Sequence, residues 1–157
     1  MRIEKFLQQS PIFQASRIAR RMEVALNVIL REEGLTLFEA LMLAAIFFEE
    51  KKGGIKPSDL AETFQTTRGN VSHCVSSLEA KGLVRRRIDE EDARSFQLVL
   101  QTMGKRRAAR VAGIFDRMQT HFEEKVGVAK LAGMLEQMRG VEKLCLQLAE
   151  GVGERGR

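Results

Sequence analysis

The 157-residue sequence has no tryptophan, no tyrosine, two prolines and two cysteines. Cys74 and Cys145 lie far apart with no Cys-x-x-Cys pair, which argues against a disulfide framework or a zinc site and fits a reducing cytoplasm. Glycine, serine and proline never gather into a linker. We therefore expect a single domain over residues 1–157, with disorder confined to the terminal GVGERGR.

Long apolar runs are also missing. The longest, residues 40–48, has nine residues, whereas roughly 20 are needed to span a bilayer. The N-terminal MRIEKFLQQSPIF has no apolar run typical of a signal peptide. These absences predict a cytoplasmic protein with no membrane partner.

Residue sets that support catalysis are absent as well. The sequence has no glycine-rich phosphate loop, no His-Glu-x-x-His and no nucleophile with a plausible base, and its His, Cys and acidic residues do not cluster as metal ligands. His73 and Cys74 are neighbours, but neighbouring helical side chains point about 100° apart. We therefore expect no catalytic residue, no metal and no cofactor.

The positive charge is concentrated in one segment. Residues 65–110 hold ten Lys and Arg against five Asp and Glu, so this segment carries the whole formal net charge of +5. A basic patch of this kind attracts polyanions, mostly nucleic acid, although anionic lipid or an acidic protein can also meet it.

Apolar residues at three- and four-residue steps predict two helices in the first third of the chain. The first begins with Ser10 as N-cap and Pro11 in the first helical position, and it ends near Gly34. Thr36 and Glu39 form a capping box, so the second helix runs over about 37–51.

Two short helices, a hairpin and two long helices follow. Pro57 opens a helix over PSDLAETF, and Thr67 caps a fourth helix that ends at Lys81-Gly82. Leu83–Ile88 and Phe96–Leu100 are predicted strands around an acidic turn. In the second strand one face should hold Phe96, Leu98 and Leu100 and the other Ser95, Gln97 and Val99. The helical period then returns from Thr102 to Phe122 and again from Val128 to Leu148.

This order predicts a mainly α fold with a small β-hairpin wing. The third and fourth helices form a helix-turn-helix, and the hairpin completes a winged helix over about 36–101. The terminal helices, about 10–32 and 103–149, are too apolar to be covered by so small a core, so we expect them to join two copies in a two-fold homodimer. The predicted interface residues are Ile12, Val128, Leu131, Leu135, Met138, Cys145 and Leu148.

The fourth helix has two distinct faces. The helical period turns Val71, Cys74, Val75 and Leu78 toward the core and leaves Gly69, His73, Ser76 and Ser77 outward, with Asn70 and Ser72 on the flanks. Short polar side chains suit contact with base edges in a major groove. A helical glycine costs roughly 1 kcal/mol against alanine, so we expect Gly69 to serve close approach to DNA. The alternative is a neutral glycine and a merely exposed histidine.

The wing carries arginines and acids side by side. Successive strand residues face opposite ways, so Arg85 and Arg87 together, or Arg86 alone, can follow one phosphate path. Asp92 is two residues from Arg94 and can orient its guanidinium through a bidentate pair. The remaining acids, Asp89, Glu90 and Glu91, are expected in a solvated turn.

With these residues in view, the stretch of about 35–107 resembles the multiple-antibiotic-resistance regulator (MarR) family of bacterial transcription factors. The resemblance runs through LTLFEALML, PSDLAETF and TTRGNVSHCVSSLEAKGLVRRRIDEEDARSFQLVLQTMGKRR. It implies a cytoplasmic homodimer on an inverted-repeat operator, and in many members a small aromatic or phenolic effector releases the DNA. Gln101 replaces the usual Thr, so Thr102 is expected to cap the fifth helix, and Lys56 replaces the usual hydroxyl cap before Pro57.

The resemblance also implies roles for single residues. Arg68, Asn70, Ser72 and His73 fall where the recognition helix meets bases and phosphates, Arg94 falls where a wing arginine enters the minor groove, and Asp92 falls where an acid orients it. We therefore predict a sequence-specific DNA-binding regulator, expected to be a repressor. A basic protein-interaction module or a nonspecific nucleic-acid binder is the alternative. The predicted DNA-binding residues are Thr67, Arg68, Gly69, Asn70, Ser72, His73, Ser76, Arg86 and Arg94.

Overall fold

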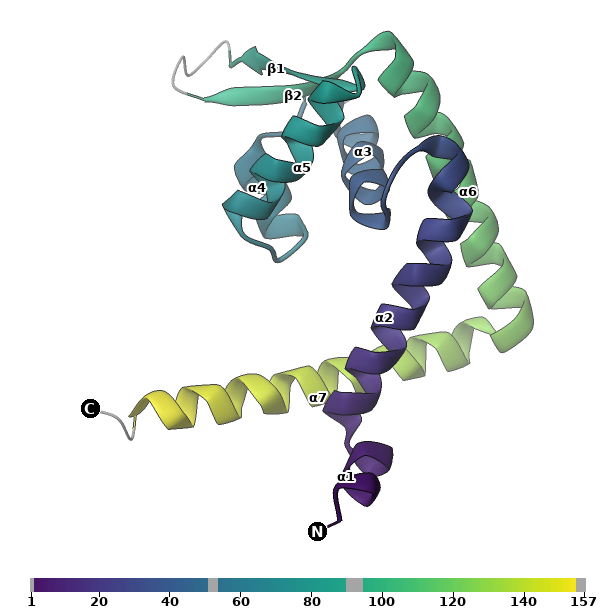
Figure 1. Cartoon of the computed structure of the whole chain (residues 1–157), viewed down its shortest axis with the longest axis vertical. Coiled ribbons are helices and arrows are strands. Elements are labelled where there is room, and N and C mark those ends of the chain that lie inside the picture. The colour runs from purple at the N-terminus through teal and green to yellow at the C-terminus, as the bar shows by residue number, and fades with distance from the viewer. Residues whose placement is uncertain (1, 51–53, 90–94, 155–157) are drawn as a thin grey trace. The chain divides into compact units, whose positions relative to one another are not determined.

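The structure, a computed structural model, describes residues 2–50, 54–89 and 95–154. Contacts divide the chain into two compact units: a chain-end unit, up to Met22 and from Asp116 onward, and a central unit, Glu23–Phe115. Figure 1 labels the elements in chain order. They are α1 (Ile3–Gln9), α2 (Pro11–Ile29), the 3-10 helix η1 (Leu30–Glu33), α3 (Leu37–Glu50), α4 (Pro57–Thr63), α5 (Arg68–Ala80), β1 (Val84–Ile88), β2 (Phe96–Leu100), α6 (Thr102–Val126) and α7 (Val128–Glu154).

The predicted fold class is confirmed, since the chain is mainly helical with one antiparallel two-stranded hairpin. The predicted start of the first long helix is confirmed, since α2 begins at Pro11 and the Ser10 hydroxyl accepts from the Phe13 N–H over 3.3 Å. A short helix, α1, which the sequence did not indicate, precedes it, and the Ser10 N–H closes α1 by donating to Phe6 O over 2.8 Å. The prediction for the other chain end was wrong, because α7 continues to Glu154, through part of the tail that we expected to be disordered.

The local signals for helix ends are confirmed in the central part of the chain. The Thr36 N–H donates to the Glu39 carboxylate over 2.8 Å, and the Glu39 N–H donates to the Thr36 hydroxyl over 3.3 Å, which is the predicted capping box. Gly34 and Gly82 follow helices with φ of 64° and 67°, the left-handed conformation that glycine adopts without strain.

The core of the central unit lies between α3, α5 and the base of the hairpin. Helix α3 buries Met42, Leu43 and Ile46, and α5 buries the four residues predicted for its inner face. In Figure 1, α4 and α5 lie together as the two helices of the helix-turn-helix, next to α3. The buried inner face of α5 is Val71, Cys74, Val75 and Leu78.

The hairpin pairs in register from Val84 opposite Leu100 to Ile88 opposite Phe96. The predicted strand over Phe96–Leu100 is confirmed, but burial does not alternate along it, because Phe96 is 46% exposed and Val99 only 8%. The far end of the hairpin, with Ile88 and Phe96, extends past the core, whereas the base is covered on both faces. The sequence also gave no sign that Ile55 pairs with the hairpin, where its carbonyl accepts from the Leu98 N–H over 2.9 Å.

Helix α6 begins close against the start of β1. Gln101 accepts from the Lys105 N–H over 2.9 Å and donates its own N–H to Leu83 O over 2.9 Å, so Gln101 holds the cap position and the predicted cap at Thr102 was wrong. A Cβ added to Gly104 would lie 1.9 Å from Leu83 O. Only glycine allows this approach of helix to strand.

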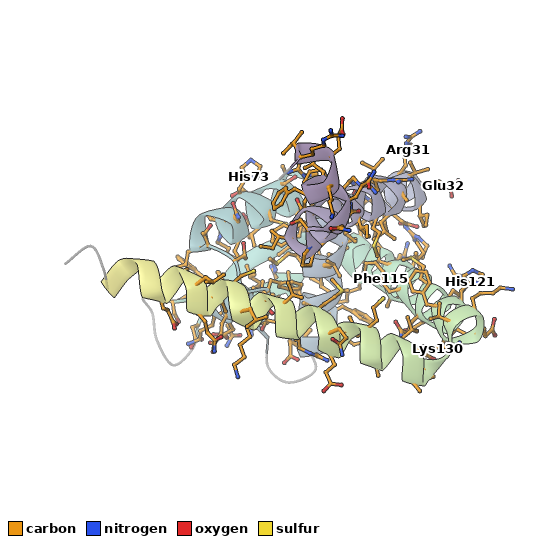
Figure 2. The ribbon with its side chains drawn as sticks, turned by 90° about the horizontal axis from the view of Figure 1, so that it is seen from below. Arg31, Glu32, His73, Phe115, His121 and Lys130 are labelled. Carbon is orange, nitrogen blue, oxygen red and sulfur yellow. The ribbon has the colours of Figure 1, made fainter. Side chains whose placement is uncertain are left out.

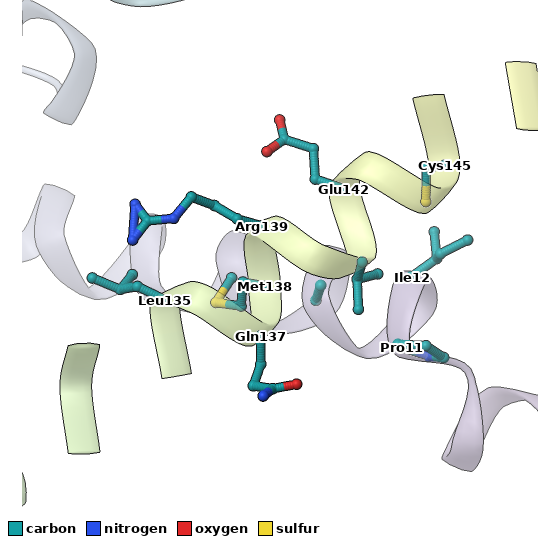
Figure 3. Close-up of a pocket in the computed structure, with 10 residues that line it drawn as sticks. Pro11, Ile12, Leu135, Gln137, Met138, Arg139, Glu142 and Cys145 are labelled. Carbon is teal, nitrogen blue, oxygen red and sulfur yellow. The ribbon is translucent and has the colours of Figure 1, made fainter. Parts of the chain in front are cut away.

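The chain-end unit consists of α1, the first part of α2, the last part of α6 and α7. Among its described residues no hydrophobic side chain is fully buried. A hollow of about 660 Å³ runs between α2 and α7 and is lined by Leu135 and Met138, with Ile12 across from Cys145 (Figure 3). Of the predicted dimer residues, Ile12, Val128, Leu135, Met138 and Leu148 are exposed, and Leu131 and Cys145 are half-buried. No helix in the described part of the chain has the length and apolarity needed to cross a bilayer.

Candidate nucleic-acid interface

Helix α5 presents an exposed polar face of the kind expected at a nucleic-acid interface. Thr67 is its N-cap, and its hydroxyl accepts from the Asn70 N–H over 3.2 Å. The Asn70 side chain donates to the Thr66 hydroxyl over 3.1 Å, which holds the amide at the start of the helix. Figure 2 shows the His73 ring standing out from α5. The exposed residues of this face are Arg68, Gly69, Asn70, Ser72, His73 and Ser76.

One residue expected on the outward face lies elsewhere. Ser77 is half-buried and donates its hydroxyl to the Glu39 carboxylate over 2.6 Å. The last turns of α5 pack against the start of α3, so a side chain one position beyond Ser76 already faces the protein rather than the surroundings.

The arginines of β1 divide between its two sides. The Arg86 guanidinium pairs with the Glu79 carboxylate at 2.7 Å and lies 3.5 Å from the Ser76 hydroxyl, so Arg86 is held beside the outer face of α5. Arg87 instead donates to the Gln97 side chain across the hairpin over 2.9 Å. Of the two arrangements that the sequence left open, Arg86 alone therefore adjoins the polar face of α5.

Asp89 was expected in a solvated turn, and this was wrong. Its carboxylate is buried, accepts from the Gln97 amide over 3.2 Å and pairs with Lys56 Nζ at 3.1 Å. Lys56 precedes α4, so this ion pair joins the far end of the hairpin, just beyond Ile88, to the helix-turn-helix. The other wing residues of interest, Glu90, Glu91, Asp92 and Arg94, lie outside the described residues.

Glu39 has a larger role than the sequence indicated. Beyond capping α3, its buried carboxylate accepts from Lys81 Nζ over 2.7 Å and from Ser77 over 2.6 Å, both on or next to α5. Burial alone would raise the pKa of Glu39, but the hydrogen bonds from Lys81, Ser77 and Thr36 outweigh it and lower the pKa. Glu39 is therefore ionised at neutral pH.

Neither the buried cysteine of α5 nor the possible metal ligands of the described residues form a reactive centre. Burial raises the pKa of the Cys74 thiol to about 11, so it stays protonated and acts as a small core residue. Among the described residues no group of three His, Cys, Asp or Glu is placed to hold a metal ion.

Residues 50–96, which include α4, α5 and β1, match the sequence model of the MarR family. This part of the chain, which holds the helix-turn-helix and the first strand of the hairpin, is therefore similar to the MarR family. A comparison with curated proteins gave no match.

Solved structures show the same MarR fold over most of the chain. MepR of Staphylococcus aureus in a DNA complex has a TM-score of 0.76 at 20% identity and covers 88% of this chain and 98% of its own. FabT of Streptococcus pneumoniae in complex with DNA has a TM-score of 0.64 at 20% identity, covering 86% of this chain and 94% of its own. MarR from Oenococcus oeni has a TM-score of 0.70 at 13% identity, with coverages of 83% and 96%.

Proposed function

We propose that this protein is a DNA-binding transcription regulator of the MarR family. It would act as a cytoplasmic homodimeric repressor, with α5 of each protomer in a major groove and the wing in the adjacent minor groove of a palindromic operator. The observation that carries the proposal is the exposed, small and polar face of α5 with Arg86 held beside it. MepR and FabT have been crystallised with DNA, and they share the fold that presents this face. The proposed DNA-binding residues are Thr67, Arg68, Gly69, Asn70, Ser72, His73, Ser76, Arg86 and, in the wing, Arg94, oriented by Asp92.

The side chains of this face suit distinct contacts. The amide of Asn70 has the donor and acceptor that pair with adenine, and the His73 ring can contact a base edge or a phosphate. Arg68, at the start of the helix, can meet a phosphate together with the backbone N–H groups of the first turn. Glu79 fixes the Arg86 guanidinium and so lowers the entropy lost when Arg86 binds DNA.

The homodimer is supported by the state of the chain-end unit. Its exposed apolar residues along α2 and α7 need a covering surface, and a two-fold axis supplies the same surface from a second copy. The single-domain organisation with a DNA-binding lobe of about 36–101 and dimerisation helices of about 10–32 and 103–149 belongs to the same proposal. Two-fold symmetry requires half-sites roughly 10 bp apart, centre to centre.

Release by a small aromatic effector completes the proposal. It rests on the resemblance of the chain to MarR-family regulators, many of which lose DNA when such a molecule binds. A change in the spacing of the two α5 helices would then lower the affinity, because both half-sites have to be met at once.

The deciding experiment is a binding selection from random duplex DNA at near-physiological salt. We expect recovery of a shared palindrome with half-sites about one helical turn apart. Recovery without a shared motif would favour the alternative, a nonspecific polyanion binder or a module for an acidic protein partner.

His73→Ala tests whether α5 reads the sequence of that operator. We expect the preferred bases at one position of each half-site to become less well defined, as happens when one base contact is lost. His121→Ala, the same change at the other histidine of the chain, in the chain-end part of α6, is the control and should leave the selected motif unchanged. A motif unaffected by His73→Ala would remove His73 from the interface.

A further inference from the structure

Two segments that are distant in sequence, the start of α3 and the end of α5, meet at the Glu39 carboxylate. It caps its own helix through the Thr36 N–H, binds Ser77 on α5 over 2.6 Å, and binds Lys81, the C-cap of α5, over 2.7 Å at both oxygens. The Lys81 ammonium also donates to Gly34 O over 3.0 Å, in the turn before α3. The end of α5 is thereby tied to the start of α3.

These bonds constrain α5 in a way that its apolar face does not. The inner face of α5 packs by hydrophobic contact, which is not directional, so it tolerates a small rotation or slide of the helix. Hydrogen bonds to a buried carboxylate depend on distance and angle. Because Ser77 and Lys81 lie four residues apart on one side of α5, bonding both fixes the helix about its axis and along it.

The outer face of α5 that is proposed to contact DNA lies within about one helical turn of the Ser77–Glu39 hydrogen bond. Ser77 is four residues after His73, about 6 Å along the helix, and directly follows Ser76. A rotation of α5 at Ser77 therefore moves His73 and Ser76 together. Base contacts are directional and would be lost, whereas attraction to phosphates would largely persist.

We propose that Glu39 is a positioning residue for DNA recognition, holding α5 through Ser77 and Lys81 at the rotation in which its outer face can contact base edges. The inference rests on the proposed function of α5. Glu39 is buried and is not one of the proposed DNA-binding residues, yet it would contribute to the preference of the protein for particular base sequences.

The test compares Glu39→Gln with the wild-type chain in fluorescence anisotropy. Each protein is titrated with the operator duplex recovered from the selection and with a scrambled duplex of equal length. We expect operator affinity to fall on the order of tenfold, as for the loss of about one directional contact, and scrambled-duplex affinity to change less than about twofold. The slope of log affinity against log salt should stay the same, because no phosphate contact is removed.

Glu33→Gln is the matched control. Glu33 is also a glutamate with a lowered pKa, held by Arg110 and Arg107, but its partners lie on α6 and not on α5. We expect Glu33→Gln to leave the ratio of operator to scrambled affinity unchanged. An equal fall of that ratio in both variants would mean that any lost ion pair has this effect, and it would refute a specific role for Glu39.

Ser77→Ala provides the milder variant, since it removes the 2.6 Å bond and keeps the Glu39–Lys81 ion pair. It decides the matter where circular dichroism shows that Glu39→Gln does not fold. A reduced affinity ratio in folded Ser77→Ala supports the proposal, and an unchanged ratio in a folded variant overturns it. A wild-type chain that binds both duplexes equally would instead refute the proposed function itself, and the positioning role with it.

Discussion

Gly69→Ala should separate the stability of the fold from its ability to bind DNA. Gly69 is the second residue of α5, directly after Arg68, and it is exposed. A Cβ added there would meet only the Thr67 hydroxyl, at 3.8 Å, which is ordinary van der Waals contact. Its φ is not positive, so alanine fits the backbone without strain. Nothing in the described part of the chain therefore requires glycine at this position.

The expected gain in stability follows from helix propensity. Alanine is favoured over glycine by roughly 0.8–1 kcal/mol in a helix interior, and the position near the N-terminus of α5 sets this as an upper bound. For a chain of this size, 1 kcal/mol raises Tm by about 2–4 °C. We expect a rise of that order or slightly less. The same methyl group would stand on the proposed DNA-facing surface, where it would keep the helix backbone away from the groove, so operator affinity should fall.

Both quantities can be measured on one preparation. Calorimetry at a fixed protomer concentration gives Tm, and anisotropy with the selected operator gives Kd. A higher Tm together with unchanged operator affinity would refute the close-approach interpretation of Gly69. A lower Tm would show that the glycine is needed by the fold.

Three further results are expected. Gly104→Ala should lower the free energy of unfolding in urea by at least about 1–3 kcal/mol, because its Cβ would lie 1.9 Å from a backbone oxygen; a change below that range would contradict the tight contact with Leu83. The pKa values of Glu33 and Glu39 are lowered in the fold, so their contribution is complete above the ordinary glutamate pKa of about 4.3 and is lost as pH falls through the lowered values. The urea midpoint of unfolding should therefore fall as the pH is lowered through that range, and it should fall less in Glu39→Gln than in the wild-type chain. An equal fall in both proteins would show that Glu39 does not contribute to the pH dependence of stability. Leu135→Lys in α7 would bury an unpaired charge in the proposed dimer interface, so the molar mass measured by light scattering should fall from that of a dimer to that of a monomer. A mass that stays at the dimer value would place the interface elsewhere.

Local sequence signals predicted most of the fold because each has a local physical cause. The Thr36–Glu39 capping box and the glycines at 34 and 82 set helix ends through bonds and backbone conformations of a few adjacent residues. The inner face of α5 follows from helical periodicity alone. Helix α1 lacked such a signal, since Arg2 makes no side-chain cap and no residue of α1 is buried.

The buried charges could not be predicted, because their partners come from distant parts of the chain. Asp89 stands in an acidic run and reads as a surface residue, yet Lys56, 33 positions earlier, pairs with it at 3.1 Å. In the sequence, Glu39 is explained fully by its capping box with Thr36, but its carboxylate also binds Lys81, which is 42 positions away. The one available hint was Lys56 itself, a cation in place of the usual hydroxyl before Pro57.

In the proposed homodimer, the chain-end unit would contribute both to folding and to DNA binding. None of its described hydrophobic side chains is fully buried in one chain, so the second copy would supply the hydrophobic stabilisation of α1 and α7. Dimer formation would then stabilise the fold by mass action and at the same time supply the second α5 that a palindrome requires. A single protomer would keep the Glu39 attachment and the polar face of α5, because both lie in the central unit with its own buried core. It would nevertheless bind one half-site only, so dilution should remove operator binding before it removes the structure that reads each half.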